Sequence, residues 1–102
     1  MHNIIQMGLQ DSSELIQHLT FTFIKVLIER TGGEMKIPLK FVDIYNDACI
    51  KRGGINNKYE ANIEMRHYIR DNLMQNGYIF VDPKDVDSIH LTLKAIDEYS
   101  DY

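Results

Sequence analysis

The fold is decided by the stretch KYEANIEMRHYIRDNLMQNGYIFVDPKDVDSIHLTL, residues 58–93. Its first part, residues 58–76, carries apolar residues at helical spacing, and Gly77 supplies the usual helix stop. Two short runs typical of strands follow at 78–81 and 89–93, separated by a turn that contains Asp-Pro. The stretch therefore predicts a helix followed by a two-strand hairpin.

The side-chain pattern within this stretch indicates which faces are buried. In the second run, Ile89, Leu91 and Leu93 are expected on one face, with His90 and Thr92 on the other. The helix offers an apolar stripe that would face the core, and this stripe consists of Met65, Tyr68, Ile69 and Leu73.

Upstream, Asp11-Ser-Ser-Glu14 resembles a capping box and predicts a helix that runs to about Arg30 and ends at Gly32-Gly33. Its apolar arc is roughly twice as wide as the stripe of about 100° that a single core needs. The second apolar stripe comprises Phe21, Ile24 and Ile28. It requires cover, and we expect a second copy of the chain to supply it, so that the protein is a homodimer. The alternative is that residues 1–10 fold over this stripe.

Residues 34–37 alternate in polarity and predict a minimal strand, and Pro38 suits the first turn of the next helix. That helix is expected over residues 39–51, followed by Gly53-Gly54. Its expected buried side is formed by Phe41, Ile44, Tyr45 and Ala48, joined by Val42 or Cys49. Residues 55–57 would form a turn before the next helix.

The predicted organisation is a single domain over residues 11–99, with an N-terminal arm at 1–10 and a tail at 100–102. Residues 94–99 predict a final short helix. The single cysteine, Cys49, cannot form an internal disulfide, which favours a reducing compartment such as the cytoplasm. The sequence shows neither a signal peptide nor an apolar run long enough for a membrane span, so no membrane partner is expected.

The charge is distributed unevenly. The net charge is −4, yet residues 51–70 hold five basic residues against two acidic ones. Residues 82–102 hold six acidic residues against two lysines. An acidic body with one basic region binds phosphate locally and repels it elsewhere.

The predicted order of elements is helix, short strand, helix, turn, helix, two-strand hairpin and short helix. Three segments carry a family resemblance: GEMKIPL at 33–39, LMQNGYI at 73–79 and IHLTLK at 89–94. Together they resemble the winged helix-turn-helix superfamily of small bacterial, archaeal and viral transcription regulators. The resemblance implies an α+β, mainly α fold with three main helices, a short first strand, a two-strand wing and a short C-terminal helix.

The resemblance implies a DNA-binding regulator of transcription or replication that reads duplex DNA with the helix at 58–76. The residues expected near base edges are Asn56, Asn57, Lys58, Tyr59 and Asn62. The residues expected to hold phosphates are Lys51, Arg52, Arg66 and Arg70.

Each of these residues also has a purely structural interpretation. Asn56 and Asn57 suit a turn and a helix cap, and Arg66 and Arg70 could pair with carboxylates one turn away. The acidic residues of the helix and of the hairpin turn favour a different function, a winged helix that contacts another protein. Its contacts would come from Tyr59, Ile63 and Tyr78, or from the second stripe of the first helix.

An enzyme is not expected. The four histidines have no ligand spacing with one another or with Cys49, so neither a metal nor another cofactor is predicted. Ser88, His90 and Asp87 are neighbours in one strand, where successive side chains point to opposite faces, and nothing activates the serine. The segment around Gly53-Gly54 lacks the ending of a phosphate-binding loop.

Overall fold

A computed structural model describes residues 2–52 and 63–101, with side chains from residue 13 onward. The described elements make a mainly helical α+β chain with one antiparallel sheet of order β1-β3-β2. The elements are α1 (His2–Thr31), β1 (Leu39–Lys40), α2 (Phe41–Lys51), α3 (Ile63–Gln75), β2 (Ile79–Asp82), β3 (Asp85–Leu91) and α4 (Leu93–Tyr99). The predicted class, α+β and mainly helical, and the predicted order of helices and strands are confirmed for the described residues.

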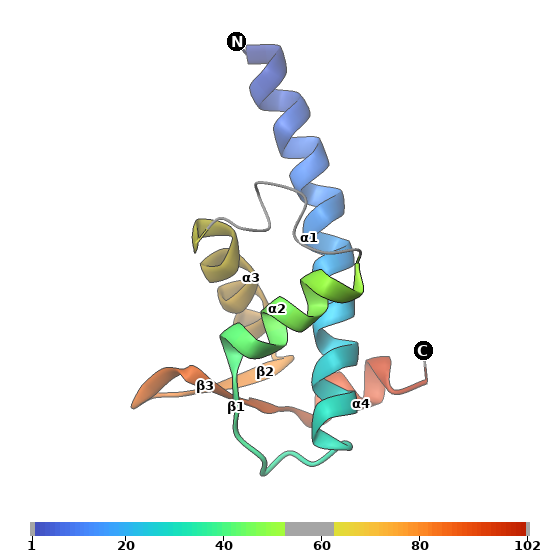
Figure 1. Ribbon diagram of the computed structural model, residues 1–102, viewed down its shortest axis with the longest axis vertical. Helices are drawn as coiled ribbons and strands as arrows, with labels where there is room; N and C mark the ends of the chain where they lie inside the picture. The colour runs from blue at the N-terminus through green and yellow to red at the C-terminus, as the bar shows by residue number, and fades with distance from the viewer. Residues whose placement is uncertain (1, 53–62, 102) are drawn as a thin grey trace.

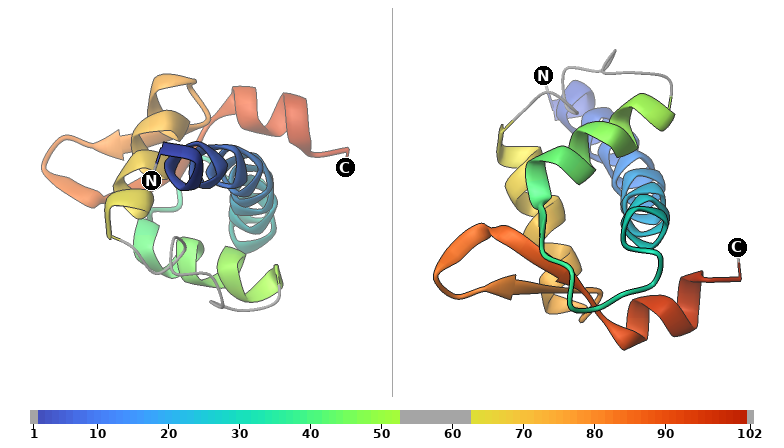
Figure 2. Two further views of the ribbon diagram at one scale, coloured as in Figure 1. Left: turned by 90° about the horizontal axis from the view of Figure 1, so that it is seen from above. Right: turned by 60° about the horizontal axis from the view of Figure 1, so that its bottom comes forward.

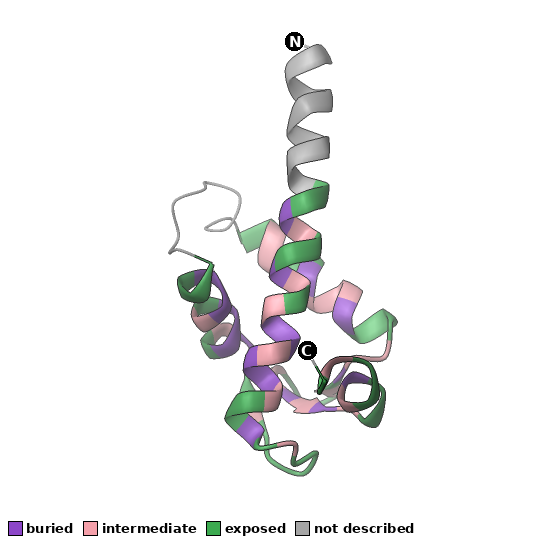
Figure 3. Ribbon diagram, turned by 90° about the vertical axis from the view of Figure 1, so that its right-hand side faces the viewer, coloured by how far each residue is buried: buried purple, intermediate pink, exposed green. Residues whose placement is uncertain are grey.

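Helix α1 is the longest element, and the others gather around its C-terminal part (Figure 1). Helices α2 and α3 lie to one side of it, α4 lies on the other, and the sheet closes the bottom of the molecule in Figures 1 and 2. Figure 3 shows buried positions recurring along α1 between exposed ones, as expected for a helix that enters a core.

The core fills the space between the helices and the inner face of the sheet. Its fully buried aromatic residues are Phe23 of α1 and Tyr45 of α2. The ring centroids of Phe23 and Phe41 lie 5.1 Å apart. The sheet contributes Ile79, Ile89 and Leu91. The remaining buried members come from α1, α2, α3 and α4, and they are Leu19, Ile24, Val26, Leu27, Ile44, Ala48, Cys49, Ile69, Leu73 and Ala95.

Two predicted helix ends are confirmed by their hydrogen bonds. At the end of α3, the Tyr78 amide donates to the Leu73 carbonyl at 2.9 Å and the Gly77 amide donates to Met74 at 3.0 Å. This is the Schellman pattern, and Gly77 takes the positive φ of 79° that it requires. Helix α1 ends in the same pattern at Gly32 and Gly33.

The N-terminal boundary of the first helix is a correction. Helix α1 begins at His2 and passes through Asp11 without a break, so the predicted helix start at Asp11 is wrong. A single glycine, Gly8, costs a helix only about 1 kcal/mol. The helix-forming residues on both sides compensate for this cost. Asp11 therefore lies inside the helix and does not cap its start.

The first strand is also corrected. Residues 34–37 are not a strand, with a turn at Met35 and Lys36, and β1 is Leu39–Lys40, which begins five residues later than predicted. Long-range pairing sets this position, because Leu39 pairs with Ile89 and Lys40 pairs with Ser88. Pro38 precedes the strand instead of starting the helix, which begins at Phe41.

The returning strand ends earlier than expected. Ile89 and Leu91 face the core as predicted, but Leu93 does not share their face. Thr92 caps α4 by accepting a hydrogen bond from the Ala95 amide, and Leu93 is the exposed first residue of that helix. Strand β3 therefore ends at Leu91, because Thr92 serves as a helix cap and does not continue the strand.

Candidate nucleic-acid interface

Helix α3 is held against the core by a narrow contact. Its only fully buried residues in the described part are Ile69 and Leu73, which are spaced by one helical turn. Ile63 and Met74, near the two ends of the helix, are exposed, and so is Tyr68. The described part of α3 therefore presents most of its circumference to the outside.

The outward surface of α3 is polar but not basic. Tyr68, Asp71, Asn72 and Gln75 line a shallow hollow of about 230 Å³ along it. Glu64 lies at the N-terminal end of the described helix. The carboxylates of Asp71 and Glu64 repel a phosphate that approaches the centre of this surface.

The two predicted phosphate ligands of α3 lie together on its flank. Arg66 and Arg70 are half-buried, and with His67 they line a small pocket of about 130 Å³ between α3 and the first turn of α2. The Nε atom of Arg70 lies 3.5 Å from the Oδ1 atom of the adjacent residue, Asp71. This pairing is with a sequence neighbour, whereas the sequence suggested a partner one turn away.

An acidic residue from the hairpin enters the same pocket. Oδ1 of Asp87 accepts a hydrogen bond from the Val42 amide at 3.2 Å, and Asp87 lines the pocket beside Arg66 and Arg70. The N-cap residue of α2, Lys40, supplies no side-chain cap. Asp87 therefore caps α2 from β3, where a carboxylate is favoured by the unpaired amides and the helix dipole.

The basic residues predicted at the end of α2 do not join this group. The Nζ atom of Lys51 lies 3.1 Å from a carboxylate oxygen of Glu29, so Lys51 faces α1. Arg52 follows as the C-cap residue, at the opposite end of an 11-residue helix from the pocket. The four predicted phosphate ligands are thus divided between two places. The predicted base-contacting residues Asn56, Asn57, Lys58, Tyr59 and Asn62 lie outside the described residues.

The hairpin turn uses its acidic side chains locally. Oδ1 of Asp82 accepts from the Lys84 amide at 2.8 Å, and Oδ1 of Asp85 accepts from the Asp87 amide at 3.1 Å. These are turn contacts of the kind that aspartate makes with its own backbone. The acidic turn is accordingly explained by local structure without a partner.

The second stripe of α1 is covered in part by the chain itself. Ile24 is fully buried at 0% exposure, so the prediction that it needs cover from a second copy is wrong. Ile28 is partly buried and packs against the core. Phe21 remains 39% exposed, with its ring 5.8 Å from that of Tyr99 in α4. Helix α4 is thus an intrachain neighbour of this stripe that the sequence prediction did not consider.

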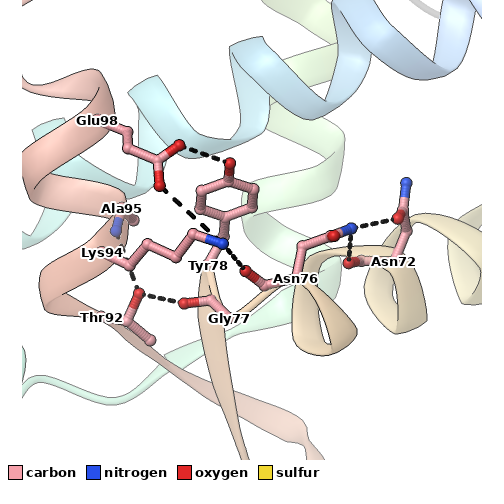
Figure 4. A network of polar contacts seen from close by, with 8 residues as sticks. All are labelled: Asn72, Asn76, Gly77, Tyr78, Thr92, Lys94, Ala95 and Glu98. Atoms are coloured by element: carbon pink, nitrogen blue, oxygen red, sulfur yellow. Dashed lines mark hydrogen bonds and ion pairs between the residues drawn. The ribbon is translucent and has the colours of Figure 1, made fainter.

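The junction between α3 and α4 contains contacts that sequence reasoning missed (Figure 4). Lys94 donates a hydrogen bond to the Asn76 carbonyl, and its Nζ lies 4.7 Å from the centre of the Tyr78 ring. The Tyr78 hydroxyl donates to Glu98 at 2.8 Å. Only the helix start at Thr92 left a sequence signal, a threonine directly before a helical segment.

The described residues contain no group of three or more histidine, cysteine, aspartate or glutamate side chains placed to hold a metal ion. Within the same residues, no helix combines the length and the apolar character needed to cross a membrane. Comparison of the chain with family models, with curated proteins and with solved structures gave no match in any of the three.

Proposed function

We propose that this chain is a winged helix DNA-binding regulator that reads duplex DNA with the helix at 58–76. The observation that carries the proposal is the position of Arg66 and Arg70. Both lie on the flank of an otherwise exposed helix, beside the first turn of α2 and the hairpin. In a winged helix these three elements would border the DNA backbone, and arginines there would bind phosphates and set the position of the reading helix.

The arrangement of elements supports this proposal. A short strand precedes α2 and pairs with the second strand of the hairpin, which places the hairpin beside the two helices. Helix α3 fully buries only Ile69 and Leu73 among its described residues, and about half of these residues are exposed to a partner. In such a protein α2 would cross the backbone while α3 enters the major groove, whose width admits one helix.

The electrostatics of the pocket predict weak, orientation-dependent binding. Asp87 lies with the two arginines and lowers the net positive charge that a phosphate would meet. The outward carboxylates of Glu64 and Asp71 would favour one orientation of the helix in the groove over others.

The test is fluorescence anisotropy of a labelled duplex pool titrated with protein at several salt concentrations. Replacement of both arginines, Arg66→Ala/Arg70→Ala, should weaken binding to every sequence alike. It should also lower the log–log salt slope by roughly 0.9 for each phosphate that the variant no longer neutralises.

A charge-matched control variant is Lys25→Gln/Arg30→Gln, which removes two positive charges of α1 that do not line the pocket. The control should retain the wild-type salt slope. Binding that is absent at low salt, or that falls equally in both variants, would contradict the proposal.

A second candidate is a winged helix that contacts another protein. Three exposed apolar side chains of α3 favour it, and these are Ile63, Tyr68 and Met74. Tyr78, which was also predicted to contact a partner, is occupied by Glu98 and Lys94. Loss of a defined protein partner on Tyr68→Ala, with duplex binding absent, would select this candidate.

A further inference from the structure

The outer face of the sheet, which points away from the helices, carries two aromatic side chains. Strand alternation turns Ile79, Ile89 and Leu91 toward the core and leaves Phe80 and His90 on the other face. These two residues are cross-strand partners, with ring centroids 6.1 Å apart and planes inclined by 58°. The side chain of Phe80 is 55% exposed, which is unusual for a phenylalanine.

The loop between α1 and β1 turns this face into a hollow. Met35 and Lys36 line it together with Phe80, His90 and the edge of Leu91, and its volume is about 470 Å³. Figure 2 shows this loop passing across the bottom of the sheet when that side of the molecule comes forward. The hollow is shallow and open, so a ligand would lie on it with one side in solvent.

A hydrogen bond fixes the ring of His90 within this hollow. Its Nδ1 atom lies 3.1 Å from the carbonyl oxygen of Met35. A carbonyl only accepts hydrogen bonds, so Nδ1 carries the proton in this contact, and in the neutral ring Nε2 is left as an acceptor. The contact also ties the loop to β3, so that the hollow is formed in advance of any ligand.

Positive charge lies at one side of the hollow. Lys36 lines it directly, and Lys40 is exposed on the next strand, where it pairs with Ser88, two residues from His90. The acidic side chain on the same face of β2 is Asp82, whose carboxylate accepts from the Lys84 amide in the turn. The hollow therefore combines an exposed aromatic ring, a hydrogen-bond acceptor and one lysine, and a second lysine lies on the adjacent strand β1.

We propose that this hollow binds a nucleotide unit, with the base stacked on Phe80 and the phosphate near Lys36 and Lys40. An aromatic ring accepts the π-face of any base, and lysines beside it accept the backbone phosphate, which is how sheets bind unpaired nucleotides. His90 would accept a hydrogen bond from an amino or hydroxyl group of the ligand. The unit is either a free nucleotide or one residue of a single strand.

Charge argues against a second copy of the chain as the occupant. In a two-fold contact through this face, the acidic side chain of β2 that could meet these lysines is Asp82, which already binds the Lys84 amide of its own turn. An apolar peptide would bury the same lysines without a partner. An anionic aromatic ligand satisfies both the ring and the lysines.

The test is a ¹⁵N–¹H correlation titration of the ¹⁵N-labelled protein with two probes, deoxyadenosine monophosphate and a single-stranded eight-residue oligo(dA). Both should shift the amides of Lys36, Phe80 and His90. A free nucleotide as the natural ligand predicts similar affinity for the two probes, whereas a single strand predicts tighter binding of the oligonucleotide.

The decisive variant is Phe80→Leu, which keeps an apolar side chain at an exposed position but removes the ring. It should weaken both probes roughly tenfold, as expected for the loss of one stacked base. Lys36→Gln/Lys40→Gln should weaken the nucleotide while leaving the affinity for adenosine, which has no phosphate, unchanged.

Three results would overturn the proposal: no shifts at millimolar probe, equal affinity in Phe80→Leu, or a dimer in sedimentation that Phe80→Leu dissociates. Duplex binding is assigned to a different pocket, which is lined by Arg66 and Arg70 and by none of the residues of this hollow. Failure of this test therefore leaves the proposal of duplex binding unaffected. The variant Arg66→Ala/Arg70→Ala should bind deoxyadenosine monophosphate and oligo(dA) as tightly as the wild type.

Discussion

The hydroxyl of Thr92 donates a hydrogen bond to the carbonyl oxygen of Gly77 at 2.7 Å while it accepts one from the Ala95 amide at 3.2 Å. A single oxygen atom thus joins the end of α3 to the start of α4. Because Gly77 also closes the Schellman turn of α3, the direction in which the chain leaves that helix is fixed by both residues.

Replacing this oxygen should destabilise the fold. We expect Thr92→Val to lower the free energy of unfolding by about 2 kcal/mol, because it removes a helix cap and a partly buried hydrogen bond. Thr92→Ser keeps the hydroxyl and should retain most of the stability. Urea unfolding followed by circular dichroism measures both variants. Equal urea midpoints for wild type and Thr92→Val would show that the bond contributes nothing.

The charge of Asp87 can be separated from its capping role. Asp87→Asn keeps an oxygen that accepts from the Val42 amide but removes the negative charge beside Arg66 and Arg70. If phosphates bind there, affinity for duplex DNA should rise several-fold at low salt, with little change in stability.

Asp87→Ala is the matched control, because it removes the same charge together with the cap. It should gain affinity in the same way but lose about 1 kcal/mol of stability. Unchanged duplex affinity in both variants, measured by anisotropy, would place the phosphate contacts elsewhere on the protein.

Local rules explain what the sequence predicted correctly. Gly32, Gly33 and Gly77 end helices because a left-handed residue there satisfies orphan carbonyls, and this depends on a few neighbouring residues. The helix predicted at 39–51, which begins two residues later at Phe41, and the alternation of Ile89 and Leu91 follow in the same way from short-range periodicity.

Contacts between distant residues explain the errors. The first strand lies where Leu39 meets Ile89, fifty positions away in the sequence. The Asp87 cap bridges 45 positions. The burial of Ile24 depends on how the other elements pack around α1, which a helical wheel does not show. For the candidate site, the sequence predicted a phosphate-binding role for Arg66, Arg70 and Lys51 together, but it did not predict that Lys51 pairs with Glu29 of α1.

Burial of ionisable groups predicts a fold that weakens in alkali. Burial raises the pKa of the Cys49 thiol, and burial together with Cys49 raises the pKa of the Tyr45 phenol. Both groups stay protonated in the folded state at pH values where the unfolded chain releases their protons. The folded state then binds more protons, so the free energy of unfolding should fall as pH rises above about 9.

Urea midpoints at pH 7, 9 and 10.5 measure this effect, and Cys49→Ala should reduce the loss between the last two values. A midpoint that stays constant across this range would contradict the assignment. At pH 8 the thiol should also react slowly with iodoacetamide, because Cys49 is fully buried and reaction requires its thiolate.

The exposure of Phe21 and the burial of Ile24 separate the dimer prediction from internal packing. Ile24→Ala should lower the free energy of unfolding by about 2–5 kcal/mol, equally at low and high protein concentration, because its contacts lie within one chain. Phe21→Asp changes a side chain that is 39% exposed, so the variant should remain folded. If α1 pairs with a second copy through Phe21, this variant should sediment as a monomer while the wild type sediments as a dimer. A wild type that is monomeric at every concentration would show that the dimer prediction is wrong. Phe21 would then pack only within its own chain, where its ring contacts Tyr99.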